Sequence, residues 1–253
     1  MQVRLLVCVV LALAGAACAE APEPGSSPAA SGPPRVQSEV VARHAAQFDQ
    51  AIPKRPAGSQ QEATAATYIL GHLQVAGYAV RLDSVPVRDL VSSTNVVALP
   101  PGGRAPKVVV AVAYDDATGG ARLADDIGLF LEAARALRSA GAGHSVAFVA
   151  LGAQDTEVGG GRLGSRRLVR LLLERDEDPV IVSLSGAGDS GEVCSSPPEP
   201  SRLGGVEDLA RLPRCEPAID DPFLDAPLPH IAVGGPPEAL GEQLLAALAP
   251  AEG

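Results

Sequence analysis

The chain is predicted to be an α/β protein, a three-layer α/β/α sandwich whose central sheet is mixed and mainly parallel. Two apolar runs carry this prediction, at residues 107–113 and 145–151, because Val-rich runs of this length are typical of strands covered on both faces. An amphipathic helix is predicted between them at 124–139. Strand, helix and strand in this order form the crossover unit of parallel sheets. Both runs are followed by carboxylates, so a site is expected at the carboxyl edge of the sheet.

The remaining elements are predicted in order along the chain. Apolar residues at helical spacing indicate a helix at 36–48. A capping box from Ser59 to Glu62 begins a second helix, which ends before Gly77. A helix at 165–175 carries basic residues on its exposed side. Strands are predicted at 78–85, 93–99, 179–184 and 231–233, and a last helix at 237–248.

The segment from Asp189 to Pro222 is long, polar and rich in proline, and it is predicted to be either a lid or an insertion. It contains Cys194 and Cys215, the two cysteines left once Cys8 and Cys18 are assigned to the N-terminal signal. In an oxidising compartment these two residues are candidates for a disulfide. The alternative is a pair of free thiols.

Residues 1–19 are typical of an export signal, with one early charge, a short apolar run and then small residues. Cleavage before Cys18 would leave a lipid-anchored protein, whereas cleavage after Ala19 would release a soluble one. Residues 20–34 are rich in Pro, Ser and Ala, as expected of a disordered tether ahead of a domain at 35–253. We therefore expect an exported protein, periplasmic or extracellular, whose only membrane attachment would be a lipid at Cys18.

The composition limits the partners and the core. The formal net charge is −10, which argues against a nucleic-acid partner. Aromatic residues make up 3% of the chain and Trp is absent, so the core is expected to consist of Val, Leu and Ala.

Five short motifs occur in an order that resembles metallopeptidase family 28, the bacterial zinc aminopeptidases. They are R-x-x-G-S at Arg55–Ser59, L-x-x-x-G-Y-x-V at Leu73–Val80, N-V-V-A at Asn95–Ala98, L-E-x-A-R-x-L at Leu131–Leu137 and G-S-R at Gly164–Arg166. The resemblance covers residues 38–250 and implies the zinc-peptidase fold. It also implies two zinc ions held by two His, two Asp and one Glu, with a second Glu as general base.

Carried over residue by residue, the resemblance implies a degenerate metal site. Ala113 stands where the family has its first His ligand, and Ser185 stands where it has an Asp ligand. Gln154 occupies the position of the general base, and an amide cannot accept a proton at neutral pH. Asp115 matches the family's Asp that orients the first His.

Three carboxylates remain as metal candidates. Asp155 is at the Glu ligand, Asp221 replaces the last His, and Asp126 falls at the bridging Asp if the alignment is gapped. Without the gap, Arg122 falls there. These carboxylates could form an oxygen-rich site for Ca²⁺ or Mg²⁺, or simply be solvated or stabilise helix N-termini.

Two hypotheses about function follow. The first is a non-catalytic, peptidase-like domain without a cofactor, which binds a protein or peptide partner in the cell envelope. The second is a metal-dependent exopeptidase with a rearranged ligand set and two zinc ions. The second requires at least three of five side chains to surround one point: Asp115, Asp126, Asp155, Asp221 and His230. Glu157 could then replace the missing base, although a loop position without function is the alternative.

Overall fold

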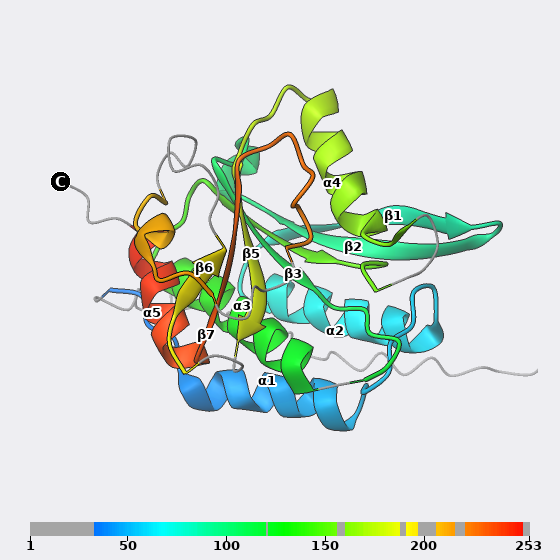
Figure 1. Ribbon diagram of the computed structural model, residues 1–253, viewed down its shortest axis with the longest axis horizontal. Helices are drawn as coiled ribbons and strands as arrows, with labels where there is room; N and C mark the ends of the chain where they lie inside the picture. Colours follow the sequence, from blue (N-terminus) through cyan, green and yellow to red (C-terminus); the bar gives the residue numbers. More distant parts are fainter. Residues whose placement is uncertain are drawn as a thin grey trace, which may run out of the picture.

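The computed structural model describes residues 33–119, 121–155, 160–187, 191–196, 206–215 and 221–249. These residues form an α/β protein around a seven-stranded sheet of order β1-β2-β4-β3-β5-β7-β6 (Figure 1). The predicted fold class is therefore confirmed. The strands are β1 (Ala79–Arg88), β2 (Val91–Leu99), β3 (Val108–Ala113), β4 (Val146–Leu151), β5 (Val180–Ala187), β6 (Cys194–Ser196) and β7 (His230–Gly235).

The sheet is mixed. Its four central strands, β4, β3, β5 and β7, are parallel, whereas β1 and β2 at one edge and β6 at the other run antiparallel to their neighbours. Because the central strands are parallel, their carboxyl ends meet at one edge of the sheet. The carboxylates that follow β3 and β4 are brought together there.

Two helical layers cover the sheet unequally (Figure 1). On one face, residues of alternating strand positions such as Val108, Val110 and Val112 pack against four helices. These are α1 (Ser38–Gln50), α2 (Gln60–Val75), α3 (Ala121–Ser139) and α5 (Pro237–Leu248). On the other face, Val109 and Ala111 pack against α4 (Leu163–Glu174) and against Phe223 and Leu228. Two short 3₁₀ helices, at Pro101–Gly103 and Leu209–Arg211, complete the named elements.

Most predicted boundaries differ from the structure by one to three residues. The strands predicted at 78–85 and 93–99 continue into a long hairpin, since Pro86 still pairs with Ser92 and Arg88 with Val91. The backbone hydrogen bonds of a hairpin form without an alternating apolar pattern. The sequence therefore gave no burial signal for this extension of the two strands. The helix expected from residue 124 begins at Ala121, and Asp126 therefore lies in its second turn.

The segment predicted as a lid or an insertion contributes an edge strand instead. Its residues Cys194–Ser196 form β6, which pairs antiparallel with β7. Three residues are too few for a periodic signal in the sequence. Cys194 and Cys215 form a disulfide, as predicted, and it joins β6 to a neighbouring described segment, whose Cys215 N–H donates to the carbonyl of Ser195.

The predicted signal at 1–19, Cys18, most of the tether and Glu157 lie outside the described residues. Within the part of the chain that the structure describes, there is no helix of the length and apolarity needed to span a bilayer.

Candidate functional site

A cavity of about 300 Å³ lies at the carboxyl ends of β3, β4 and β5. Six residues that the sequence singled out line it together: Ala113, Asp115, Asp126, Gln154, Asp155 and Ser185. The other lining residues are Leu123, Arg162, Leu184 and Pro222. Parallel strands thus bring together positions that are more than 70 residues apart in the sequence.

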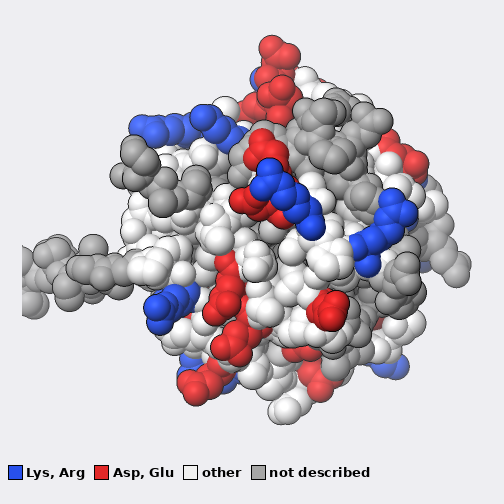
Figure 2. Space-filling view, turned by 60° about the vertical axis from the view of Figure 1, so that its left-hand side comes forward, with Lys and Arg blue, Asp and Glu red and all other residues white. Residues whose placement is uncertain are grey.

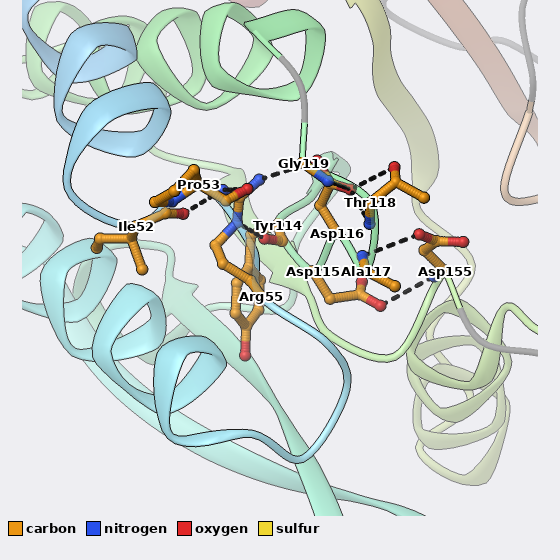
Figure 3. Close-up of polar contacts among 10 residues, drawn as sticks. All are labelled: Ile52, Pro53, Arg55, Tyr114, Asp115, Asp116, Ala117, Thr118, Gly119 and Asp155. Atoms are coloured by element: carbon orange, nitrogen blue, oxygen red, sulfur yellow. Dashed lines mark hydrogen bonds and ion pairs between the residues drawn. The ribbon is translucent and has the colours of Figure 1, made fainter.

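Asp115 lies at the floor of this cavity and is completely buried. One of its carboxylate oxygens accepts a hydrogen bond from the backbone N–H of Gln154 at 2.8 Å. The other accepts from the backbone N–H of Asp155 at 2.9 Å (Figure 3). Burial raises the pKa of Asp115 to about 7, and these two hydrogen bonds limit the rise. Asp115 therefore ties the end of β3 to the loop after β4.

Gln154, which the sequence resemblance placed at a general-base position, is bound to a helix end. With its amide oriented so that the oxygen faces α4, that oxygen accepts from the N–H groups of Ser165 (2.7 Å) and Gly164 (3.2 Å). The amide nitrogen then donates to the Ser165 hydroxyl at 3.2 Å. These N–H groups belong to the first turn of α4, where no intrahelical acceptor exists. The Gln154 side chain thus caps α4.

The other cavity carboxylates are also bonded to the backbone. Both oxygens of the buried Asp126 accept from the N–H of Gly186, at 3.2 and 3.1 Å. Asp155 accepts from the N–H of Ala117 at 3.1 Å. Asp126 points from the second turn of α3 to β5, so the alternative that it stabilises a helix N-terminus is wrong.

Asp221 and His230 form a pair of their own. Nε2 of His230 lies 3.2 Å from Oδ2 of Asp221, and Oδ1 of Asp221 accepts from the N–H of Phe223 at 2.8 Å. The other ring nitrogen of His230 lies 3.0 Å from the carbonyl oxygen of Leu228. Neither residue is among those that line the cavity.

These residues do not fit a catalytic zinc ion, which takes three protein ligands. Ala113 has no donor atom. Among the described residues, no three His, Cys, Asp or Glu side chains are placed to hold one metal ion. The requirement stated for the rearranged ligand set is therefore not met by Asp115, Asp126, Asp155, Asp221 and His230.

Arg55 stabilises the chain directly after β3, a role that was not predicted from the sequence. It is completely buried, and its Nε and Nη1 donate to the carbonyl oxygens of Tyr114 (2.6 Å) and Ile52 (2.5 Å) (Figure 3). Its Nη2 lies 3.7 Å from Oδ2 of Asp116. Burial lowers the pKa of Arg55, and the charge of Asp116 opposes this effect. The R-x-x-G-S motif was the signal that marked this position.

Glu62 is a second buried group near the site. Its backbone N–H donates to the Ser59 hydroxyl at 3.1 Å, as the capping box predicts. Its carboxylate accepts from the N–H of Gly58 at 2.5 Å and from the Ser93 hydroxyl, rather than from the N–H of Ser59. Burial raises the pKa of Glu62. The carboxylate therefore links α2 to β2 beneath the cavity.

Neither protein-family models nor curated proteins match this chain. Solved structures do. A leucine aminopeptidase precursor from Bacteroides thetaiotaomicron has a TM-score of 0.68 at 13% identity, over 88% of this chain and 100% of that one. A glutaminyl cyclase from Porphyromonas gingivalis has a TM-score of 0.68 at 15% identity, over 84% and 98%. A proposed Zn-dependent exopeptidase from Bacteroides vulgatus has a TM-score of 0.66 at 13% identity, over 87% and 98%.

These similarities establish a fold. The chain has the architecture shared by zinc-exopeptidase-like proteins and glutaminyl cyclases, in agreement with the predicted zinc-peptidase-like sandwich. Because one fold carries both activities, the fold does not choose between them. Function has to be argued from the cavity.

Proposed function

We propose, starting from this zinc-exopeptidase-like fold, that the chain is a non-catalytic domain that binds a protein or peptide partner in the cell envelope. One observation carries the proposal: the side chain at the general-base position, Gln154, caps α4 instead of facing a reacting group. Hydrolysis by this class of enzyme needs a metal-activated water and a base that accepts its proton. An amide bonded to a helix end supplies neither.

The cavity walls support the same proposal. Ala113 cannot bind a metal, and the carboxylates of Asp115, Asp126 and Asp155 accept hydrogen bonds from backbone N–H groups. These bonds join the end of β3 to the loop after β4, and α3 to β5, around the cavity. The residues that remain from a metal site thus serve as structural ties.

The cellular setting is part of the proposal. An export signal at 1–19 would deliver the chain to the periplasm or the exterior, either anchored through a lipid on Cys18 or released. The disulfide between Cys194 and Cys215 supports an oxidising compartment. The net charge of −10 disfavours nucleic acid. On the face drawn in Figure 2, acidic and basic side chains are interspersed, as on a surface that meets proteins rather than polyanions.

The second candidate is a metal-dependent exopeptidase or glutaminyl cyclase with other ligands. The observation that favours it is the presence of Asp115, Asp126 and Asp155 around one cavity of about 300 Å³. If backbone N–H groups released these carboxylates, they would offer oxygen ligands. Zinc would be the expected metal by analogy with the exopeptidases.

Metal binding separates the two candidates. The mature domain, residues 35–253, is purified without chelators, titrated with Zn²⁺ by calorimetry and assayed for aminopeptidase and glutamine cyclisation activity. We expect no binding at micromolar zinc and no turnover, while the B. thetaiotaomicron aminopeptidase serves as positive control. Tight zinc binding that disappears in Asp126→Asn, together with turnover, would replace the binding proposal by the enzyme.

A further inference from the structure

A second hollow adjoins the cavity, with which it shares Arg162 and Pro222, and lies on the thinly covered face of the sheet. It is a groove of about 540 Å³ between α4 and the segment 222–227, which passes beside α4 in Figure 1. Its apolar lining includes Val169 and Leu173 of α4 and, opposite them, Phe223 and Ala226. Among the described elements, α4 is the one helix that packs on this face, together with Phe223 and Leu228.

The groove has a basic wall. Arg162, Arg166 and Arg170 all line it; Arg162 directly precedes α4, and the spacing of four residues places Arg166 and Arg170 on one side of the helix. Arg167, on another side of the helix, pairs with Asp83 of β1 at 3.1 Å. Three arginines along one groove are notable in a chain of net charge −10.

Two acidic residues also line the groove, Glu174 and Asp225. Glu174 is one turn beyond Arg170 at the C-terminal end of α4. Three arginines thus line the groove against two carboxylates, so its charge favours an anionic group.

One apolar side chain of the lining reaches well into solvent, since Leu173 is 51% exposed. The volume also falls within the range of about 300–1,000 Å³ that small-molecule sites occupy.

We propose that this groove binds an amphipathic carboxylate, an aliphatic chain with one anionic head. The tail packs on Val169, Phe223 and Ala226, and the head is bound by the guanidinium groups of Arg166 and Arg170. Guanidinium groups match a carboxylate in charge and in planar, forked geometry. An extended peptide fits less well, because the walls are a helix face and a loop, without a strand edge for backbone pairing. The proposal holds whether or not the cavity takes a metal, so its test is separate.

Octanoate is the probe, since it stays monomeric at millimolar concentration. Binding to the mature protein is followed by calorimetry and by backbone amide shifts on α4. We expect octanoate to bind at least about tenfold more tightly than octanol or octylammonium, which carry the same tail with a neutral or a cationic head.

Variants locate the site. Replacing both exposed arginines, Arg166→Gln with Arg170→Gln, is expected to weaken octanoate at least about tenfold, because both charge-assisted contacts are lost. Arg175→Gln is the matched control: it removes an exposed arginine at the end of the same helix but outside the groove, and it should change the affinity less than twofold. Ala226→Leu, which fills the apolar floor, should weaken octanoate and octanol alike.

Three results would overturn the proposal. The first is absence of binding at millimolar octanoate in a folded protein. The second is equal loss of affinity in Arg175→Gln and in the double variant. The third is tighter binding of an acidic peptide with an apolar side chain than of octanoate, which would make the groove a peptide site.

Discussion

The Asp115 carboxylate accepts a hydrogen bond from the backbone N–H of Gln154 at 2.8 Å, across the carboxyl ends of β3 and β4. The side chain of the same Gln154 reaches the other way and caps α4. A single residue thus connects the central sheet to the helix on its thinly covered face. Two residues that line the cavity therefore hold elements of the fold together.

Asp115 should make the stability of the protein depend on pH. Its pKa is about 7 when folded, against 3.8 for an unperturbed Asp, so the folded state binds the proton more tightly. Its stabilising contribution is complete below the unfolded value and is lost as pH rises through about 7. The free energy of unfolding from urea titrations should therefore fall between about pH 4 and about pH 7.

Asp115→Asn should flatten this dependence, because an amide does not titrate. Part of the slope should remain, since burial also raises the pKa of Glu62 and acts with the same sign. The exposed control Asp178→Asn is expected to keep the full slope. An unchanged slope in Asp115→Asn would show that Asp115 is not the titrating group.

Gln154 should contribute as a helix cap and not as a catalytic base. Gln154→Ala leaves the first N–H groups of α4 without their acceptor, and we expect a loss of about 1 kcal/mol in the free energy of unfolding. Gln154→Glu should retain most of the stability, because a carboxylate accepts the same bonds and is favoured by the positive end of the helix dipole. Gln74→Ala, on the exposed side of α2, is the control. Equal losses in Gln154→Ala and Gln74→Ala would contradict the cap.

Much of the fold was predictable because its signals are local. The runs that became β3 and β4 were predicted to within a residue or two, since strands buried on both faces are continuously apolar. The disulfide could be predicted because, once Cys8 and Cys18 are assigned to an expected export signal, one pair of cysteines is left. By contrast, β6 is three residues long and polar, and only its pairing with β7 reveals it.

The site was predictable in position but not in its contacts. Six of the named residues do line one cavity, because the ends of parallel strands must meet. That Gln154 caps a helix beginning at Leu163 could not be predicted, because capping residues normally directly precede their helix. The buried contacts of Arg55 join segments about 60 residues apart, and no local pattern encodes them.

Gly164 should be irreplaceable for a steric reason. A Cβ atom there would lie 2.2 Å from the carbonyl oxygen of Gly152 and 2.7 Å from Oδ1 of Asn95. Gly164→Ala forces α4 away from β4, and we expect it to lower the free energy of unfolding by at least about 2 kcal/mol. The matched control is Gly71→Ala within α2, where nothing lies within 4 Å of the added atom. That change should stabilise by about 0.5–1 kcal/mol, and a similar gain at Gly164 would refute the close approach.

Replacing Arg55 should strongly lower the free energy of unfolding, because its contacts lie in the interior. Arg55→Met removes the donors to the carbonyl groups of Tyr114 and Ile52 and leaves the buried Asp116 without its cation. We expect a loss of about 3–5 kcal/mol, measured by urea unfolding. Arg55→Lys keeps the charge, but its ammonium group lacks the planar, forked donors that bond the two carbonyl groups. The loss in the free energy of unfolding should therefore be intermediate. The exposed control Arg104→Met should stay within about 0.5 kcal/mol of the wild type. If Arg55→Met unfolds at the same urea concentration as Arg104→Met, the buried contacts do not stabilise the end of β3.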